Sequence, residues 1–595
     1  MQNFLKCKQN GINKRKGEDM RKKKEILSMI AEIIGGQKKC LFFLFVFTII
    51  SSLLLSMSAY VDKEIVDSIQ RFEKNKLLHW ISLSVLVEVI VIAISSQLEV
   101  QKMEFSYRTS IQFTKKVIHK IKKIRFELLE DKKNLDLIER VYEQSEQFPD
   151  MIHQGIRLFS RITVVISYVI VLGTVSWYFS LITIGMTIPY FFMLKRQGFE
   201  RYEQEVEIST DTRKIDYLFQ VLSSREYQKE IKTFQLTKYL SEKYFNIRKK
   251  LWKKRKKLLV CHSLMAIVVT FIKNSSFLVC MVFTCILIIR KETGLGSFML
   301  VLSVIEGLRN STLEILELFG EYNEKGFYLS DFYEFMKLPE EQEKRREKIG
   351  EKTIRVENVS FRYPNAKELA LNKISTIIGE NEMVAIVGEN GSGKSTFVNL
   401  LLGLYEPQEG EIRVGNHLLG EVLDDMREKT GVVLQNFNQY QFTIEENLIG
   451  NKKGSREDWE KMKPLLSFVE ELPKTWQTPL GQLEEKGIEL SGGNWQRIAL
   501  GRAFLKKDSE FLLLDEPVSA FDPKIENEIY EQLPILCKNK TTILISHRLS
   551  VTKVCDRILV FEKGQIVEEG THEQLMEKQG IYFKMYQAQQ SLYET

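Results

Sequence analysis

The sequence predicts two domains of different fold class: an all-α membrane domain of six transmembrane helices over residues 41–330 and an α/β domain over residues 352–595. A linker at 331–351 joins them. A chain of 595 residues exceeds a single ordinary core, so two or more domains are expected. Long uncharged runs occupy only the first 320 residues. After Lys352, strand-like apolar runs and a glycine-rich loop replace them.

The N-terminal segment, residues 1–40, is strongly basic, with eleven Lys or Arg residues against four Asp or Glu residues. Such a segment can bind nucleic acid or can flank a membrane span on its cytoplasmic side. We favour a cytoplasmic flank with an elbow helix and no nucleic-acid partner, because an uncharged run begins at Leu41. The segment is too long and too charged for a cleaved signal peptide, so we expect this run to remain as an anchor. The seven cysteines show no CxxC or zinc spacing and are expected to be reduced.

The membrane spans follow from the length of the apolar runs, since a helix needs ~20 apolar residues to cross ~30 Å of hydrocarbon. The uncharged run Ile162–Leu194 is too long for one crossing and should fold into two about Gly173–Ser180, with a kink at Pro189. The expected spans are about 41–61, 79–98, 156–175, 177–195, 258–289 and 296–319.

The last two spans are ambiguous. Leu258–Ile289 carries one charge, Lys273, and could cross once or twice, whereas Gly296–Phe319 holds four charged residues. A basic N-terminus and a nucleotide domain on the same cytoplasmic side require an even number of crossings. We favour one crossing by each segment, because two halves of ~15 residues are short for full crossings.

The two loops between spans two and three and between spans four and five are rich in Lys, Arg and Glu. The excess of basic residues places such loops in the cytoplasm. Because they hold few Gly or Pro residues, we expect helices that continue out of the membrane.

A phosphate loop opens the second domain. Residues Gly388–Ser395 match the pattern GxxxxGK[ST] between a buried strand and a helix. In such a loop the glycines let backbone N–H groups converge on the β-phosphate, and Lys394 reaches the β and γ oxygens. Ser395 offers its hydroxyl to Mg²⁺. The match therefore predicts a site for ATP and Mg²⁺.

Two further strand ends carry polar residues. Asp515 ends the apolar strand Phe511–Leu514 and is placed to hold the Mg²⁺ shell, while Glu516 would polarise the attacking water. An isolated Glu would be read as a solvated carboxylate, but the strand before it argues against that interpretation. His547 follows the strand "TTILISH" and is expected near the γ-phosphate, although a single strand-end histidine is more often structural.

With these motifs in order, residues 352–585 resemble the ATPase domain of ABC transporters, and residues 20–330 resemble the six-helix membrane domain of exporter-type (type IV) members. The resemblance implies an ABC-type P-loop NTPase fold in a half-transporter, and a D-loop at Ser519–Asp522. The site residues it implies are, for catalysis, Glu516, His547 and Gln435; for nucleotide binding, Tyr363 (the adenine-stacking aromatic), Gly388, Asn390, Gly391, Ser392, Gly393, Lys394, Ser395, Thr396, Ser491, Gly492, Gly493 and Asp515; and for Mg²⁺ with ATP, Ser395, Gln435 and Asp515.

The signature motif lies at Leu490–Gly493. In the family it contacts the γ-phosphate of ATP held by the facing subunit. Ser491 and the amides of Gly492 and Gly493 have suitable donors and a suitable helix dipole for this contact. The resemblance therefore implies a homodimer, or a pair with a related half-transporter, in which each chain supplies half of each site.

Two positions depart from the family pattern, which usually has Gln at Asn494 and Ala at Gly501. Asn494 keeps the amide on a shorter side chain, so a contact across the interface would lengthen or be lost. Gly501 within a helix costs up to ~1 kcal/mol relative to Ala, which suggests a local packing requirement. By position in the family, the helices that dock on the ATPase domains are expected at 134–147 and 210–222.

The resemblance implies ATP-driven export of an amphipathic substrate across a bacterial cytoplasmic membrane by a multi-pass protein whose ATPase domain is cytoplasmic. Four ionisable residues fall within the expected spans: Glu88, Lys273, Glu306 and Arg309. Glu306 and Arg309 can pair with each other or can line the path. A charged path suits a peptide, which is our favoured substrate. A lipid flippase and a multidrug exporter remain alternatives, and so does a non-transporting ATP-gated regulator, although an intact Glu516 argues against the regulator.

Overall fold

The computed structural model describes residues 24–26, 28–143, 148–290, 293–341, 347–364, 366–450, 460, 462–506, 508–518, 521 and 523–591. The chain forms two compact units. The helical unit comprises Met1–Lys123 and Lys132–Leu338, and the α/β unit comprises Ile124–Asp131 and Pro339–Thr595. Residues 1–23 of the predicted basic segment and residues 519, 520 and 522 of the predicted D-loop lie outside the described residues.

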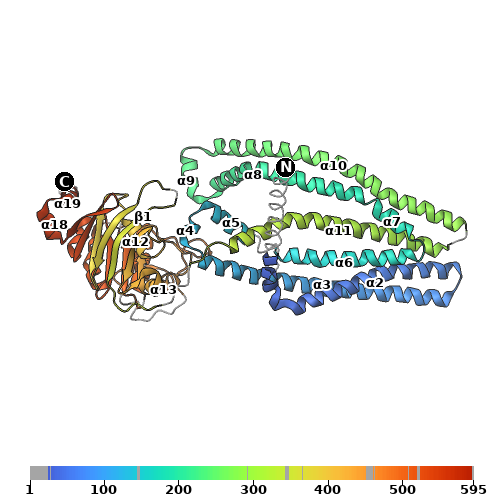
Figure 1. The fold of residues 1–595 in the computed structure, drawn as a ribbon, viewed down its shortest axis with the longest axis horizontal. Coiled ribbons are helices and arrows are strands. Elements are labelled where there is room, and N and C mark those ends of the chain that lie inside the picture. The colour runs from blue at the N-terminus through green and yellow to red at the C-terminus, as the bar shows by residue number, and fades with distance from the viewer. Residues whose placement is uncertain are drawn as a thin grey trace, which may run out of the picture. The chain divides into compact units, whose positions relative to one another are not determined.

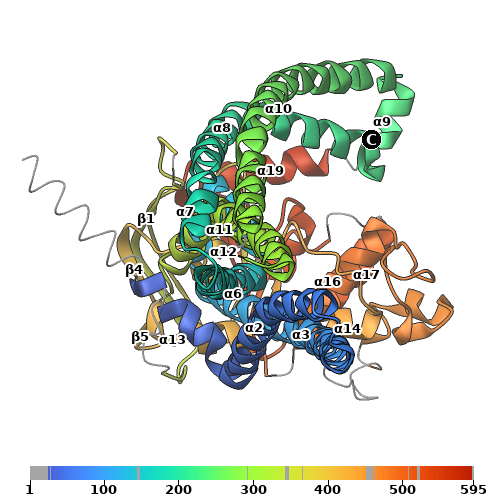
Figure 2. The same cartoon turned by 90° about the vertical axis from the view of Figure 1, so that its right-hand side faces the viewer.

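Long helices make up the first unit (Figure 1). They are η1 (Gly35–Gln37), α2 (Lys38–Gln70), α3 (Lys74–Lys123), α5 (Lys132–Glu143), α6 (Phe148–Gly173), α7 (Tyr178–Gly185), α8 (Ile188–Ser223), α9 (Arg225–Thr233), α10 (Thr237–Ile289) and α11 (Leu295–Met336). Helix α2 packs on α3, α6 on α11, and α8 on α10. Figure 2 shows α9 joining α8 to α10. The prediction that the cytoplasmic loops are helices continuing from the spans is confirmed, because α3 has 50 residues and α10 has 53.

Five helices among the described residues are long and apolar enough to cross a membrane: they lie within 24–70, 74–123, 148–173, 178–198 and 237–289. Helix α11 is not among them, since charged residues interrupt its apolar run. Its buried side is nevertheless apolar over the first turns, with Leu300, Val304 and Leu308 each 0% exposed. The sixth span at 296–319 therefore stays a prediction.

The expected kink at Pro189 takes a different form. The helix is interrupted between α7 and α8, and Pro189 lies in the first turn of α8. A proline is tolerated there because the first N–H groups of a helix have no partner within the helix. The proline thus starts a new helix instead of bending a continuous one.

The α/β unit contains two sheets. The smaller has the order β2 (Leu371–Ile378), β1 (Ile354–Phe361), β4 (Glu409–Val414) and β5 (His417–Leu418), all antiparallel neighbours. The larger has the order β10 (Gln565–Gly570), β9 (Arg557–Glu562), β3 (Met383–Gly388), β8 (Thr541–Ile545), β7 (Phe511–Asp515) and β6 (Thr430–Val433). The helices of the unit are α4 (Phe126–Leu129), α12 (Lys394–Leu401), α13 (Leu419–Lys429), α14 (Ile444–Ile449), η2 (Ser467–Glu471), η3 (Thr475–Gln477), α16 (Gly492–Phe504), α17 (Pro523–Leu536), η4 (Leu549–Val554), α18 (His572–Lys578) and α19 (Ile581–Gln590).

The five strands from β9 to β6 are parallel neighbours, and β3, β7 and β8 are buried throughout. Continuous burial explains why these segments read as unbroken apolar runs. Parallel strands bring their carboxyl ends to one edge of the sheet, and that edge is where open sheets bind ligands. The residues after β3, β6, β7 and β8 therefore meet there.

Candidate nucleotide site

The phosphate loop joins β3 to α12 through backbone that only glycine adopts easily. Gly393 has φ of +103°, and a Cβ atom on it would stand 2.7 Å from the carbonyl oxygen of Ala370. A side chain is excluded on both counts. The loop therefore keeps its backbone N–H groups free of side-chain cover at the N-terminus of α12, which is an anion-binding arrangement.

Lys394 lies within this loop and is 6% exposed. Its Nζ donates to the carbonyl oxygens of Gly388 at 2.9 Å and Glu389 at 2.8 Å. Burial lowers the pKa of Lys394, while the charges of Glu516 and Asp515 act in the opposite direction. An anionic oxygen at the loop would add the acceptor that favours the charged form.

Asp515 ends β7 beside the loop and is 4% exposed. The Ser395 hydroxyl donates to its carboxylate, and its Oδ1 atom is buried with no hydrogen-bond partner among the described residues. Burial is the main cause that raises the pKa of Asp515. A carboxylate oxygen without a partner next to a hydroxyl is the oxygen set that Mg²⁺ prefers, so the residues present fit that ion.

We expect Asp515→Asn to stabilise the nucleotide-free protein by about 1 kcal/mol at neutral pH, because it removes a buried charge that lacks a full set of partners. A carboxyl with a raised folded-state pKa destabilises the fold when ionised, so the gain should shrink as the pH falls and wild-type Asp515 becomes protonated. Thermal unfolding of detergent-solubilised protein across acidic to neutral pH measures the effect. A lower melting temperature for the variant at neutral pH would contradict it.

Glu516 follows Asp515 in a conformation rare for its residue type, with φ of +50°. Its N–H donates to the carbonyl oxygen of Ile545 at 3.0 Å, and its own carbonyl oxygen accepts from Gln496 Nε2 at 2.9 Å. These two hydrogen bonds hold the strained backbone. The side chain of Glu516 meets Gln435 and His547, which follow β6 and β8 at the edge of the sheet.

The carboxylate of Glu516 is held from two sides. Gln435 Nε2 donates to Oε1 at 3.1 Å, and His547 Nε2 lies 3.0 Å from the same oxygen. Glu516 and His547 follow β7 and β8, as the sequence predicted for neighbouring strands, and Gln435 follows β6 at the same edge of the sheet. An oriented carboxylate at this point can accept a proton from a water molecule, which is the role of a general base.

The signature segment begins α16 with Ser491 as its N-cap, whose Oγ accepts from the N–H of Asn494 at 3.3 Å. No described atom lies within 4 Å of a Cβ built on Gly492. Among the described residues, Ser491, Gly492 and Gly493 share no hydrogen bond with the phosphate loop. They form a second anion-binding helix start apart from the first.

Packing explains one of the two departures from the family pattern. A Cβ atom on Gly501 would stand 2.6 Å from a methyl group of Leu448 in α14, so α16 and α14 approach closely at this point. The local packing requirement inferred from the sequence is confirmed. The side chain of Asn494 makes no hydrogen bond among the described residues, so nothing in one chain explains it.

Tyr363 connects the nucleotide site to a second aromatic residue. Its hydroxyl is 3.1 Å from Thr396 Oγ1 of the phosphate-loop helix, and its ring centroid lies 5.3 Å from that of Tyr405. The Tyr405 ring in turn meets the Phe126 ring edge-to-face at 5.8 Å. Three rings thus link the predicted adenine-stacking residue to the segment between α3 and α5.

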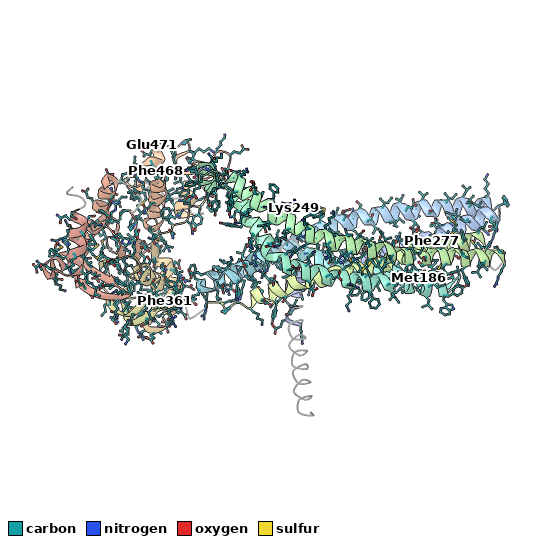
Figure 3. All side chains as sticks on the ribbon, turned by 90° about the horizontal axis from the view of Figure 1, so that it is seen from above. Met186, Lys249, Phe277, Phe361, Phe468 and Glu471 are labelled. Carbon is teal, nitrogen blue, oxygen red and sulfur yellow. The ribbon has the colours of Figure 1, made fainter. Side chains whose placement is uncertain are left out.

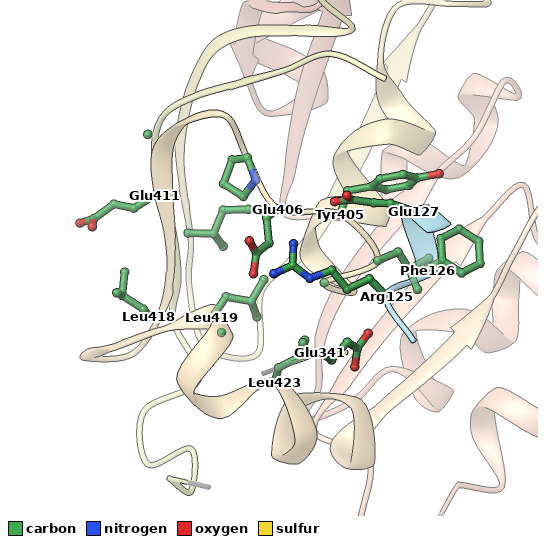
Figure 4. Close-up of a pocket in the computed structure, with 16 residues that line it drawn as sticks. Arg125, Phe126, Glu127, Glu341, Tyr405, Glu406, Glu411, Leu418, Leu419 and Leu423 are labelled. Atoms are coloured by element: carbon green, nitrogen blue, oxygen red, sulfur yellow. The ribbon is translucent and has the colours of Figure 1, made fainter. Parts of the chain in front are cut away.

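That segment, Ile124–Asp131, is part of the α/β unit. Figure 4 shows the Arg125 side chain extending toward Glu406 in a cavity that Phe126 and Tyr405 also line. Ile124 forms a β-bridge with Glu340, and the Tyr405 hydroxyl bonds the Glu130 carboxylate. Burial and this contact with Glu130 raise the pKa of Tyr405.

Residues 124–131, about ten residues before the docking helix expected at 134–147, are the ones that belong to the α/β unit, whereas residues 132–143 form α5 in the helical unit and residues 144–147 lie outside the described residues. Position in the family suggested 134–147, but α5 buries Leu137 and Val141 within the helical unit and packs on α11. The second expected docking segment, 210–222, forms the end of α8 and precedes α9.

Two residues that hold backbone near the site were missed from the sequence. Gln496, six residues after Leu490, bonds the backbone of Glu516 and so joins the signature helix to the strand that carries the carboxylate. Arg502 donates to the carbonyl oxygens of Asn447 at 2.8 Å and Asn438 at 2.7 Å, and burial lowers its pKa. Both residues lie on α16, the helix that begins at the signature motif. That position was the sequence feature that could have pointed to them.

Comparisons with known proteins cover both units. A family model described as "ABC transporter" matches residues 371–519, and one described as "ABC transporter transmembrane region" matches residues 41–312. The chain is 31% identical over 565 residues to the subtilin transport ATP-binding protein SpaT of Bacillus subtilis, covering 91% of this chain and 90% of that protein. It is 26% identical over 580 residues to the nisin transport ATP-binding protein NisT of Lactococcus lactis subsp. lactis, covering 95% and 96%.

Other matches are shorter or more distant. An ATP-dependent lipid A-core flippase of Photobacterium profundum is 33% identical over 309 residues, which are 51% of this chain and 52% of that protein. The structure of a bacterial Atm1-family ABC exporter with ATP bound superposes with a TM-score of 0.77 at 20% identity, covering 94% of this chain and 99% of that chain. This likeness concerns the fold.

Proposed function

The chain belongs to the ABC transporter family as an exporter-type half-transporter, and from this premise we propose that it exports an amphipathic peptide as a homodimer. The family makes it an ATPase coupled to transport and a multi-pass membrane protein with a cytoplasmic ATPase domain. The matched family models and the related structure agree with the predicted fold class, a helical membrane domain followed by an ABC-type ATPase domain.

One observation carries the choice of a peptide. SpaT and NisT, whose names refer to the peptides subtilin and nisin, match at least 90% of their own length and more than 90% of this chain. The lipid A-core flippase of Photobacterium profundum matches over about half of each chain. The substrate is bound by the membrane domain, so similarity that extends across the whole chain carries more weight than similarity over half of it.

The exposed side of α11 supports a polar path. Ser303, Glu306, Asn310 and Glu317 are exposed and follow one another at intervals of three, four and seven residues, so they share one face of the helix. Glu306 is 60% exposed and lies 3.8 Å from Arg309, which also donates to Asn274 at 3.4 Å. A polar face within a membrane turns to a watery cavity or a partner and not to lipid. We therefore take α11 as the sixth span and as a lining of the path.

Each residue of the nucleotide site has a separate role in binding ATP or in hydrolysing it. The amides of the phosphate loop and Lys394 bind the β- and γ-phosphates, and Tyr363 stacks on the base. Asp515, Ser395 and Gln435 would hold Mg²⁺, which neutralises phosphate charge when bound. Glu516 accepts the proton of the attacking water while Gln435 and His547 keep its carboxylate oriented.

Within the part of the chain that the structure describes, the signature segment shares no hydrogen bond with the phosphate loop, which supports a paired arrangement. Ser491 and the N–H groups that begin α16 offer donors without sharing a hydrogen bond with their own phosphate loop. A second copy facing the first would bring them to the γ-phosphate of its ATP. The homodimer then holds two nucleotides, each between two chains.

The function is tested by measuring ATP turnover and uptake in inverted proteoliposomes with a panel of cationic amphipathic peptides, phospholipids and hydrophobic drugs. We expect a peptide to stimulate turnover and to accumulate in the vesicles only when ATP is hydrolysed. Stimulation by lipids or drugs, with none by peptides, would overturn the peptide assignment in favour of a flippase or multidrug exporter.

We expect Phe126→Ala to reduce substrate-stimulated turnover and transport, because the variant loses the ring that joins residues 124–131, between α3 and α5, to Tyr405. Coupling free energies between sites usually correspond to about 5–150-fold, and an effect in that range is expected. Basal ATP turnover should change little, since Phe126 touches no phosphate-binding residue. Phe126→Leu, which keeps an apolar side chain at the contact, is the matched control. Equal losses of basal and stimulated turnover would contradict the coupling role.

A further inference from the structure

The cytoplasmic part of α10 carries the densest positive charge of any ten-residue stretch in the chain. Eight of the ten residues 248–257 are Lys or Arg, in the order RKKLWKKRKK. The run directly precedes the apolar segment Leu258–Ile289, which holds a single charged residue, Lys273. The charge therefore stands next to the membrane and not at the far end of the cytoplasmic extension.

The basic residues divide into two groups on the surface of the helix. Lys250 and Lys254 pair with α8, at 3.6 Å from Asp211 and 2.5 Å from Glu207. A second group is exposed and has no ion pair with any described residue: Lys249, Lys253, Lys256 and Lys257. Spacings of four, three and one residue put this second group on one side of α10, which we call the basic face. Figure 3 labels Lys249, the first member of the face.

An exposed tryptophan and an exposed apolar residue lie next to the basic face. Trp252 is 58% exposed and Val260 is 50% exposed, and both lie within a quarter turn or so of the lysines. Tryptophan is enriched at the level of lipid headgroups, where an apolar ring with one polar N–H is well placed. Along this side of α10 the lysines and Trp252 are followed by apolar side chains. This order is the one expected for a helix that runs from the cytoplasm through the headgroups into the hydrocarbon.

Helix length sets the depth of the basic face. The segment Leu258–Ile289 is roughly 48 Å long at ~1.5 Å per residue. A bilayer measures ~40–45 Å with its headgroups, and membrane helices tilt by ~20° on average. If Ile289 reaches the outer headgroups, Lys253, Lys256 and Lys257 stand at the inner headgroups. The lysines can then extend their ammonium groups to lipid phosphates.

We propose that the membrane-proximal part of the basic face of α10, formed by Lys253, Lys256 and Lys257, binds anionic phospholipid headgroups of the cytoplasmic leaflet. The occupant follows from charge complementarity and depth, since an anionic leaflet would present its headgroup phosphates at the level of these side chains. Each lysine at such a surface contributes about fivefold to the preference for anionic over zwitterionic lipid.

The experiment uses the full-length protein in phosphatidylcholine vesicles that contain a minor fraction of phosphatidylglycerol. Bromine atoms near the headgroup are placed either on the phosphatidylglycerol or on an equal fraction of the phosphatidylcholine. The quenching lost in a Trp252→Phe variant isolates the signal of Trp252. We expect brominated phosphatidylglycerol to quench Trp252 several-fold more than brominated phosphatidylcholine does, and we expect concentrated salt to reduce the excess, because it screens exposed charges.

Two variants with the same change of charge separate the basic face from net charge. Lys253→Gln/Lys256→Gln should abolish most of the excess quenching. Lys238→Gln/Lys243→Gln, on the same helix but farther from the membrane, should retain it. Equal quenching by the two lipids in the wild type would overturn the proposal and would be the outcome if a second copy of the chain covers this face. An excess unaffected by salt and by Lys253→Gln/Lys256→Gln would overturn it as well.

Discussion

Glu516→Gln is expected to lower ATP turnover by at least about a hundredfold, because a general base contributes ~10²–10⁴-fold and the amide cannot accept the proton. ATP binding should stay within about threefold of the wild type, since Glu516 is not among the residues that hold the phosphates. The glutamine oxygen can still accept the hydrogen bond from Gln435. Steady-state phosphate release and equilibrium binding of a fluorescent ATP analogue measure the two quantities on the same preparation.

Glu389→Gln provides the matched control. Glu389 lies in the phosphate loop and its side chain is exposed, so the change removes one negative charge at the loop without touching the carboxylate at the sheet edge. Its turnover should remain within about twofold of the wild type. Wild-type turnover in Glu516→Gln, or loss of ATP binding in that variant, would contradict the assigned role.

Gly492→Asp is expected to reduce turnover by at least about a hundredfold, since a carboxylate at the start of α16 would repel the γ-phosphate where a dipole should attract it. The space around Gly492 is open, so the folded protein should accept the side chain and melt near the wild-type temperature. Gly492→Ala adds a methyl group without charge and should retain far more turnover. Equal losses in the two variants would point to a steric effect and would contradict the electrostatic role.

The sequence was sufficient for the parts that depend on local pattern. The GxxxxGK[ST] spacing identified the loop, and the apolar strands that end at Asp515 and His547 placed their polar residues at one edge of the sheet. Helical continuations of the spans followed from charge and the scarcity of Gly and Pro. These features depend on which residues are adjacent in the chain, and adjacency is visible in a sequence.

Features that depend on contacts between distant segments could not be predicted. Phe126 meets Tyr405 across 279 positions of chain (405 − 126), and no local pattern marks either as a partner of the other. Position in the family pointed to a docking helix at 134–147, but Leu137 and Val141 are buried within the helical unit. Gln496 supports the backbone of Glu516 from another element. Each of these required the tertiary structure.

Mixed dimers test most directly whether each nucleotide lies between two chains. Lys394→Ala disables the phosphate loop and Gly492→Asp disables the signature segment; the two changes are placed either in different chains or together in one chain of a doubly tagged dimer. If the site is composite, the arrangement in different chains leaves one site intact and keeps up to about half of the turnover, while the arrangement in one chain damages both sites and keeps none. Turnover retained when both changes share a chain, and lost when they are separated, would show that each chain binds and hydrolyses ATP alone.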